Sequence, residues 1–130
     1  MRPEIYMANA YEMFFYGTKE TGVLEKQGRR NVFDYKPVPP ARKIHPTERP
    51  IELMTELIGT FVNQDADVIV PFLGSGTTLL SAANLMMYAF GYELNEPYKR
   101  PFVVRVDESE PGRYSSYGIS ATADPISEEE

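Results

Sequence analysis

A glycine loop set between a β-branched run and a helical pattern constrains this chain most. Residues 74–78 read Gly-Ser-Gly-Thr-Thr and follow residues 68–70, Val-Ile-Val, which are typical of a strand buried on both faces. Apolar residues at helical spacing then predict a helix over 77–87, and residues 88–92 predict a second strand. The order strand, glycine loop, helix, strand predicts a parallel βαβ unit and an α/β fold.

The loop and the acid that follows the second strand together suggest a nucleoside site. Glycines at a helix N-terminus expose backbone N–H groups and let a ligand approach closely. Glu93 ends the second predicted strand, where a carboxylate can accept hydrogen bonds from both ribose hydroxyls. No Gly-Lys-Ser/Thr follows, which argues against a P-loop, and Leu79 stands where a dinucleotide fold has its third glycine. The alternative is an ordinary tight turn.

Upstream of the loop, the pattern predicts a helix, a long connection and a short strand. Apolar residues at helical spacing run from 51 to 62, with Thr47 as the expected N-cap and Pro50 in the first turn. Residues 17–42 are rich in breaks and charges and predict an irregular connection. The aromatic run at residues 11–16 predicts a buried strand.

Composition excludes several kinds of site. Among 130 residues there is no Cys and a single His, so disulfides, thiolate zinc sites, Cys nucleophiles and histidine metal clusters are all ruled out. No apolar stretch approaches a membrane span and no signal peptide opens the sequence, so we expect a soluble, cytoplasmic protein. Of the net charge of −6, residues 101–130 carry most, and residues 107–130 predict an acidic flexible tail.

Four segments resemble those of DNA amino-methyltransferases, which act on N6 of adenine or N4 of cytosine. Residues 43–50, Lys-Ile-His-Pro-Thr-Glu-Arg-Pro, resemble the family's Lys-x-His-Pro-Thr-x-Lys/Arg-Pro segment. Residues 71–78 resemble its Pro-Phe-x-Gly-Ser-Gly-Thr-Thr loop for S-adenosylmethionine (AdoMet). Residues 91–98 are similar to the segment with the ribose-binding acid, and residues 11–17 to the strand before the target-recognition region.

The resemblance implies a partial Rossmann-like AdoMet-dependent methyltransferase fold with a mostly parallel sheet, in a truncated domain over residues 1–106. It implies AdoMet as the cofactor and no metal. The ribose acid would be Glu93, and the His-Pro-Thr turn would form a wall beside the methionine end. The implied cofactor-binding residues are His45, Pro46, Thr47, Phe72, Gly74, Ser75, Gly76, Thr77 and Glu93.

Two departures from the family pattern limit the expected function. The family's loop opens with Asp, where this chain has Val70. No Asp/Asn/Ser-Pro-Pro-Tyr/Phe motif is present, because Val38 precedes Pro39-Pro40 and Ala41 follows it, so no catalytic residue is assigned. We therefore expect the AdoMet-binding portion of a methyltransferase that needs a partner chain for its catalytic motif.

Two further expectations stay open. The sheet should have an uncovered edge, which predicts a homo- or hetero-oligomer or a covering partner chain. Six basic residues in 17–42 could contact DNA phosphates or form a solvated loop, and DNA would reach the protein through the partner. The alternative function is a non-catalytic remnant, phage-derived for example, that serves as a protein-binding or structural module.

Overall fold

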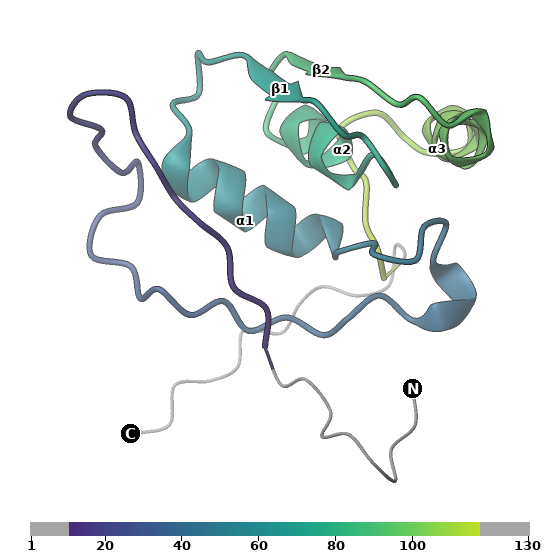
Figure 1. The fold of residues 1–130 in the computed structure, drawn as a ribbon, viewed down its shortest axis with the longest axis horizontal. Coiled ribbons are helices and arrows are strands. Elements are labelled where there is room, and N and C mark those ends of the chain that lie inside the picture. The colour runs from purple at the N-terminus through teal and green to yellow at the C-terminus, as the bar shows by residue number, and fades with distance from the viewer. Residues whose placement is uncertain (1–10, 118–130) are drawn as a thin grey trace, which may run out of the picture.

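The structure is a computed structural model that describes residues 11–117 (Figure 1). A short 3-10 helix and three α-helices alternate with two strands. In chain order these elements are η1 (Pro40–Arg42), α1 (Ile51–Phe61), β1 (Val68–Val70), α2 (Thr77–Asn84), β2 (Ala89–Gly91) and α3 (Glu96–Asp107). No helix in this range is long and apolar enough to cross a membrane.

The predicted βαβ unit is confirmed. β1 and β2 pair in parallel, with Val68 opposite Ala89 and Val70 opposite Gly91, and α2 connects them. β1 has the predicted bounds, β2 is one residue shorter at each end than the predicted strand over 88–92, and α2 ends at Asn84 rather than residue 87. The chain turns there through Met86, which has a positive φ of 58°.

The core lies between α1 and α2. α2 lies between the sheet and α1, so the elements stack in three layers (Figure 1). Ile51 and Ile58 of α1 pack in this core with Leu80 and Ala82 of α2, and all four are buried. Ser81 tightens the contact, because its hydroxyl donates to the carbonyl of Ile51 at 3.0 Å.

The two faces of the sheet differ, which corrects the prediction of a strand buried on both faces. Gly91 faces α2 closely, since a Cβ there would meet Leu79 at 2.8 Å. On the opposite face Ile69 is 68% exposed and Phe90, its partner in register, 53%. We call the side chains that share this uncovered surface the open sheet face: Ile69, Tyr88, Phe90 and Tyr92.

Helix α1 begins differently from the prediction. Its N-cap is Pro50, and no side chain of the His-Pro-Thr turn caps it. Thr47 hydrogen-bonds His45 instead, and the N–H of Ile51 donates to the Ser116 hydroxyl at 2.8 Å. The prediction of Thr47 as N-cap was therefore wrong, because a cap 65 residues away in sequence replaces it.

The ordered chain continues past residue 107, the predicted start of the flexible tail. Asn84 at the end of α2 exchanges two hydrogen bonds of 2.8 Å with the backbone of Tyr114. Ser116 is buried. Residues 114–116 therefore lie against α1 and α2, and the part of the predicted tail over residues 118–130 lies outside the described residues.

The aromatic run at residues 11–16 is not a strand, contrary to prediction. Phe15 is fully exposed, and only alternate rings pack: Phe14 contacts Phe33 and Phe61 edge-on, while Tyr16 stacks on Phe61 at 4.5 Å. Among the described residues no strand lies beside the run. Without ladder hydrogen bonds, its β propensity alone does not make a strand.

Candidate functional site

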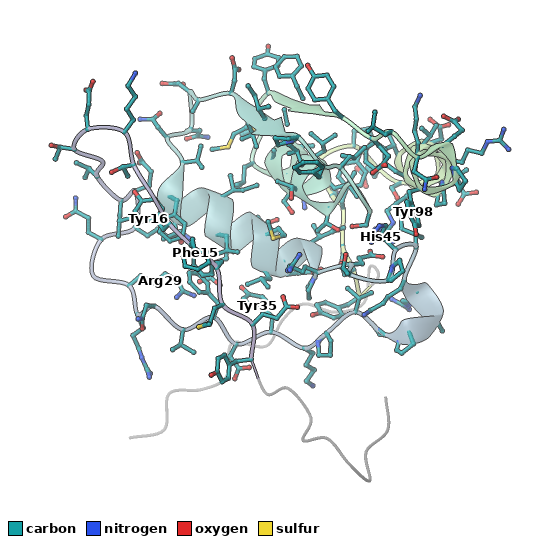
Figure 2. The ribbon with its side chains drawn as sticks, in the orientation of Figure 1. Phe15, Tyr16, Arg29, Tyr35, His45 and Tyr98 are labelled. Atoms are coloured by element: carbon teal, nitrogen blue, oxygen red, sulfur yellow. The ribbon has the colours of Figure 1, made fainter. Side chains whose placement is uncertain are left out.

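The His-Pro-Thr turn lies just before α1 and packs against α3 (Figure 2). The His45 ring sits 4.4 Å from the ring of Tyr98, measured between centroids. Its Nδ1 lies 3.1 Å from the Thr47 hydroxyl and accepts the Thr47 backbone N–H at 3.3 Å. Two partners at Nδ1 orient the imidazole, and its Nε2 lies 3.8 Å from the place that a Cβ on Gly74 would take.

A buried ion pair holds this turn to α3. Glu48 is 5% exposed, and its Oε1 accepts a hydrogen bond of 2.7 Å from Arg105. Its Oε2 accepts the backbone N–H of Ile44 at 2.7 Å. Burying a carboxylate is costly unless its oxygens are satisfied, and here both are. The pair therefore positions the turn beside the glycine loop.

The glycine loop has conformations that only glycine adopts readily. Gly74 and Gly76 have φ of 56° and 74°. The ring of Phe102, on α3, packs so closely on Gly76 that a Cβ there would overlap it. Packing and backbone conformation thus account for the glycine at position 76 without any contribution from a ligand.

The two hydroxyl side chains of the loop point inward. Ser75 and Thr77 are both buried, and their hydroxyl oxygens lie 2.8 Å apart. They tie the loop to the first turn of α2, which begins at Thr77. Any ligand on the open side of the loop would therefore meet mainly backbone.

Glu93 clamps the loop to the chain after β2. Its Oε2 accepts the N–H of Gly74 at 2.9 Å, and its Oε1 accepts the N–H of Asn95 at 2.8 Å. The hydrogen bonds from Asn95 and Gly74 hold the pKa of this carboxyl below its usual value, so Glu93 is ionised at neutral pH. The predicted acid thus lies beside the loop it was expected to serve.

An open cavity of about 130 Å³ lies between the His-Pro-Thr turn and the glycine loop. Six of the nine predicted cofactor-binding residues line it: His45, Thr47, Phe72, Gly74, Ser75 and Thr77. Of the other three, Glu93 contacts the loop through Gly74, Pro46 lies within the turn, and Gly76 is covered by Phe102. Phe72 lines the cavity with a side chain that is 90% exposed.

A second and larger cavity, about 400 Å³, shares no residue with the first and was not predicted. It lies beside α1, and its lining includes Glu56 and Tyr35, the second of which is labelled in Figure 2. Burial alone would raise the pKa of Glu56, but hydrogen bonds from Tyr35 and Arg29 outweigh it and lower the pKa. Arg29 also stacks over Phe33 at 3.7 Å. Arg29, Tyr35 and Glu56 satisfy one another, whereas Glu52 Oε2 and Thr55 Oγ1, which belong to residues that also line this cavity, are buried with no hydrogen-bond partner among the described residues. The smaller cavity at the glycine loop is the candidate site, because most of the predicted cofactor-binding residues line it.

The sequence reasoning missed the residues that hold the site together, above all those of α3. Tyr98, Phe102 and Arg105 contact His45, Gly76 and Glu48 in turn. Their spacing of three to four residues is a helical signal that was available. Pro97 and Pro101 masked it, although Pro97 lies in the first turn, where proline is tolerated.

A family model matches most of the chain, whereas the curated relatives match less than half of it and are themselves covered only in small part. A family model described as DNA methylase matches residues 9–104. The putative methylase YubD of Escherichia coli is 41% identical over 56 residues, which make up 43% of this chain and 25% of YubD. The type II methyltransferase M.HindIII of Haemophilus influenzae is 43% identical over 51 residues, 39% of this chain and 16% of that enzyme.

A solved structure agrees with the sequence matches. The crystal structure of the M1.HpyAVI–SAM complex superimposes with a TM-score of 0.57 at 28% identity, covering 67% of this chain and 45% of that one. The chain thus spans a quarter or less of the curated relatives and under half of this structure. Because the family model spans well over half of the chain, the chain belongs to the DNA methylase family of N6-adenine and N4-cytosine amino-methyltransferases.

Proposed function

We propose that this chain is the AdoMet-binding portion of a DNA N6-adenine or N4-cytosine methyltransferase, and that methyl transfer requires a second polypeptide with the catalytic motif. The convergence of three distant segments carries the proposal. The His45 turn, the glycine loop and Glu93 meet beyond the carboxyl ends of the two parallel strands, where open α/β sheets bind ligands. The similar M1.HpyAVI structure, a SAM complex, supports it.

The residues present fit the nucleoside part of AdoMet. Each Glu93 oxygen accepts one hydrogen bond within the protein and keeps a lone pair for a ribose hydroxyl. The carboxyl is ionised at neutral pH, which makes it a strong acceptor. Gly74 offers no side chain on the approach to His45. Bound there, AdoMet would supply the sulfonium methyl group for transfer to an exocyclic amino nitrogen.

The chain builds only one side of such a site. Its cavity of about 130 Å³ is well below the roughly 300–1,000 Å³ of small-molecule pockets. The Pro39-Pro40 pair leads into η1, and Val38 before it is buried in the core, so this segment offers nothing to a flipped base. A second polypeptide would supply the other wall, the catalytic motif and the path for DNA.

Calorimetric titration with AdoMet tests cofactor binding directly. We expect binding by the full chain and at least a tenfold weaker affinity for Glu93→Ala, because the variant loses the charged acceptor of the ribose hydroxyls. Glu96→Ala is the matched control, since this exposed glutamate only pairs loosely with Lys99 and Arg100. Equal AdoMet affinities for the two variants would show that Glu93 does not contribute to AdoMet binding.

A methylation assay tests the need for a partner. DNA and methyl-labelled AdoMet are incubated with the chain alone, and then with the part of M1.HpyAVI that this chain does not match. We expect label in DNA only in the mixture, because the base-binding motif comes from the second polypeptide. Methylation by the chain alone would contradict the proposal.

The second candidate is a non-catalytic remnant that binds protein. Val70 favours it, because this residue stands in place of the family's Asp and half-buries an aliphatic side chain at the end of β1. The same calorimetry separates the two functions. An absence of AdoMet binding in the folded chain, with Glu93 and the loop intact, would favour the remnant.

A further inference from the structure

We propose that the cavity of about 400 Å³ beside α1 is a second binding site, which takes a small amino acid in its zwitterionic form. The ammonium group binds at Glu52 and Thr55, and the carboxylate binds at Lys26. The cavity shares no residue with the candidate cofactor site, so this inference is independent of the proposed function.

Segments that are distant in sequence form the walls of this cavity. One face of α1 supplies residues 51, 52, 55 and 56, which have helical spacing. The connection over residues 17–42, which passes α1 on the side away from the sheet, supplies Lys26 and Tyr35 (Figure 1). Asn84 of α2 and Tyr114 complete the lining. The volume falls within the roughly 300–1,000 Å³ of small-molecule pockets.

Hydrogen bonds hold these walls in place without filling the cavity. Asn84 exchanges two hydrogen bonds of 2.8 Å with the backbone of Tyr114. Glu56 accepts hydrogen bonds from Arg29 and Tyr35, and its charge is already paired with the guanidinium. Walls that are fixed before a ligand arrives reduce the cost of ordering them on binding.

Two oxygen atoms on the α1 wall lack hydrogen-bond partners. Glu52 Oε1 accepts hydrogen bonds from the Ser115 hydroxyl at 2.6 Å and from the Ser116 N–H at 3.1 Å. Glu52 Oε2 and the hydroxyl oxygen of Thr55 are buried, and neither has a partner among the described residues. Buried polar atoms in native proteins are almost always paired, because leaving them unpaired is costly. The two oxygens therefore indicate a missing donor group.

A primary ammonium group supplies what both oxygens lack. It carries three N–H donors and a positive charge that complements the Glu52 carboxylate. The terminal torsion of a glutamate is soft, so a rotation of Glu52 turns Oε2 from the wall toward a ligand in the cavity. Among the described residues no group of three or more His, Cys, Asp or Glu side chains could hold a metal ion, so an organic cation is the better match.

Lys26 supplies the opposite charge at the other end of the cavity. The N–H groups of Glu25 and Lys26 donate to the carbonyl of Thr60 at 3.0 and 3.4 Å, which fixes the connection to the end of α1. The Lys26 side chain passes Gly59, since its Cε lies 4.0 Å from the place that a Cβ on Gly59 would take. Lys26 forms no ion pair with any described residue. Its ammonium group can therefore bind a carboxylate.

The two charges are spaced for one small zwitterion. Glu52 and Gly59 are about 10 Å apart along the axis of α1. Two hydrogen bonds of about 2.9 Å, together with the ammonium and carboxylate groups of an amino acid, bridge most of this distance. Lys26 would repel a lone cation, and Glu52 would repel a lone anion.

Titration of the full chain with L-methionine, followed by amide NMR spectra, tests the proposal. Methionine is the probe because the rings of Tyr35 and Tyr114 line the cavity and thioethers pack well against aromatic rings. We expect saturable binding with chemical-shift changes at Lys26 and residues 51–56. 3-(Methylthio)propylamine lacks the carboxylate and 4-(methylthio)butanoate lacks the ammonium group, so each should bind at least about tenfold more weakly.

Two variants locate the two ends of the ligand. Glu52→Gln should weaken methionine binding at least about tenfold, and Lys26→Met should reduce the affinity for methionine to that for the amine. Glu96→Gln on α3 and Lys19→Met on the connection are the matched controls, since both residues are exposed outside the cavity, and each should change affinity less than about twofold. Glu52→Gln keeps an acceptor oxygen for Ser116, and urea denaturation verifies that it folds.

AdoMet carries the same zwitterion at its methionine end, so Glu93→Ala distinguishes the two sources. This variant should weaken AdoMet binding and leave the affinity for free methionine unchanged. Shifts at residues 51–56 that AdoMet still causes in Glu93→Ala would identify the cofactor itself as a ligand of the second site. Methionine binding lost in Glu93→Ala but kept in Glu52→Gln would place the amino acid in the cofactor cavity and overturn the proposal. So would the absence of methionine binding at millimolar concentrations, or controls that weaken it as much as Glu52→Gln.

Discussion

The two sides of the candidate site differ although both adjoin the parallel strands β1 and β2. On the built side, the His45 turn, the glycine loop and α3 are joined by buried or paired groups such as Glu48 with Arg105. On the open side, Ile69 and Phe90 alternate with half-buried neighbours and are covered by nothing in the described chain. The comparison teaches that the candidate cofactor-facing wall is held by groups that satisfy one another, whereas the opposite sheet face is regular, apolar and uncovered by the described residues.

The largest expected effect comes from removing a core side chain behind the built side. Leu80→Ala should lower the free energy of unfolding by about 2–5 kcal/mol, because Leu80 is 2% exposed on α2 and its loss leaves a cavity. Ile69→Ala on the open side should change it by less than about 0.5 kcal/mol. Urea denaturation measures both. Similar losses of stability for the two variants would show that the two sides do not differ in packing.

A smaller loss is expected from breaking the ion pair. Glu48→Ala should destabilise the chain by about 3 kcal/mol, since it leaves the Arg105 guanidinium partly buried without its partner. Glu96→Ala, which removes only exposed pairs, should stay within about 0.5 kcal/mol. Thermal and urea unfolding of both variants measure this. If the two changes cost the same, Glu48 does not hold the turn.

A still smaller loss of stability is expected from removing the cap that Ser116 supplies to α1. Ser116→Ala should cost about 1 kcal/mol, because the N–H of Ile51 then loses its hydrogen-bond partner. Ser109→Ala, at a partly exposed position just after α3, is the control. Urea denaturation would show no difference between them if residues 114–116 did not dock on α1.

The smallest effect is a dependence on pH. The Glu93 pKa is lowered by the hydrogen bonds from Asn95 and Gly74, so its contribution to stability is present above the ordinary value of 4.5 and is lost as the pH falls through the lowered pKa. Glu93→Gln should therefore flatten part of the decline in stability below pH 4.5. Urea midpoints from pH 7 to pH 3 measure this, and parallel profiles for the two proteins would show that the clamp is absent in solution.

Local patterns predicted the elements whose neighbours lie close in sequence. The glycine loop, the β-branched run and Glu93 belong to one βαβ unit of some 25 residues, and the structure places all of them together. The prediction failed where contacts with residues distant in the sequence determine the local structure. The run at 11–16 has strand composition but no strand beside it, and α3 was hidden by prolines although it anchors the His-Pro-Thr turn.

By itself the sequence determined the family, the order of the βαβ unit and six of the residues that line the candidate site, because these follow from motif spacing and local periodicity. The tertiary structure alone decided which face of the sheet is covered, that Ser116 caps α1, and that Arg105 pairs with Glu48 across 57 residues. Those outcomes depend on which surfaces meet in space, and a strand pattern of period two describes a covered and an uncovered face equally well.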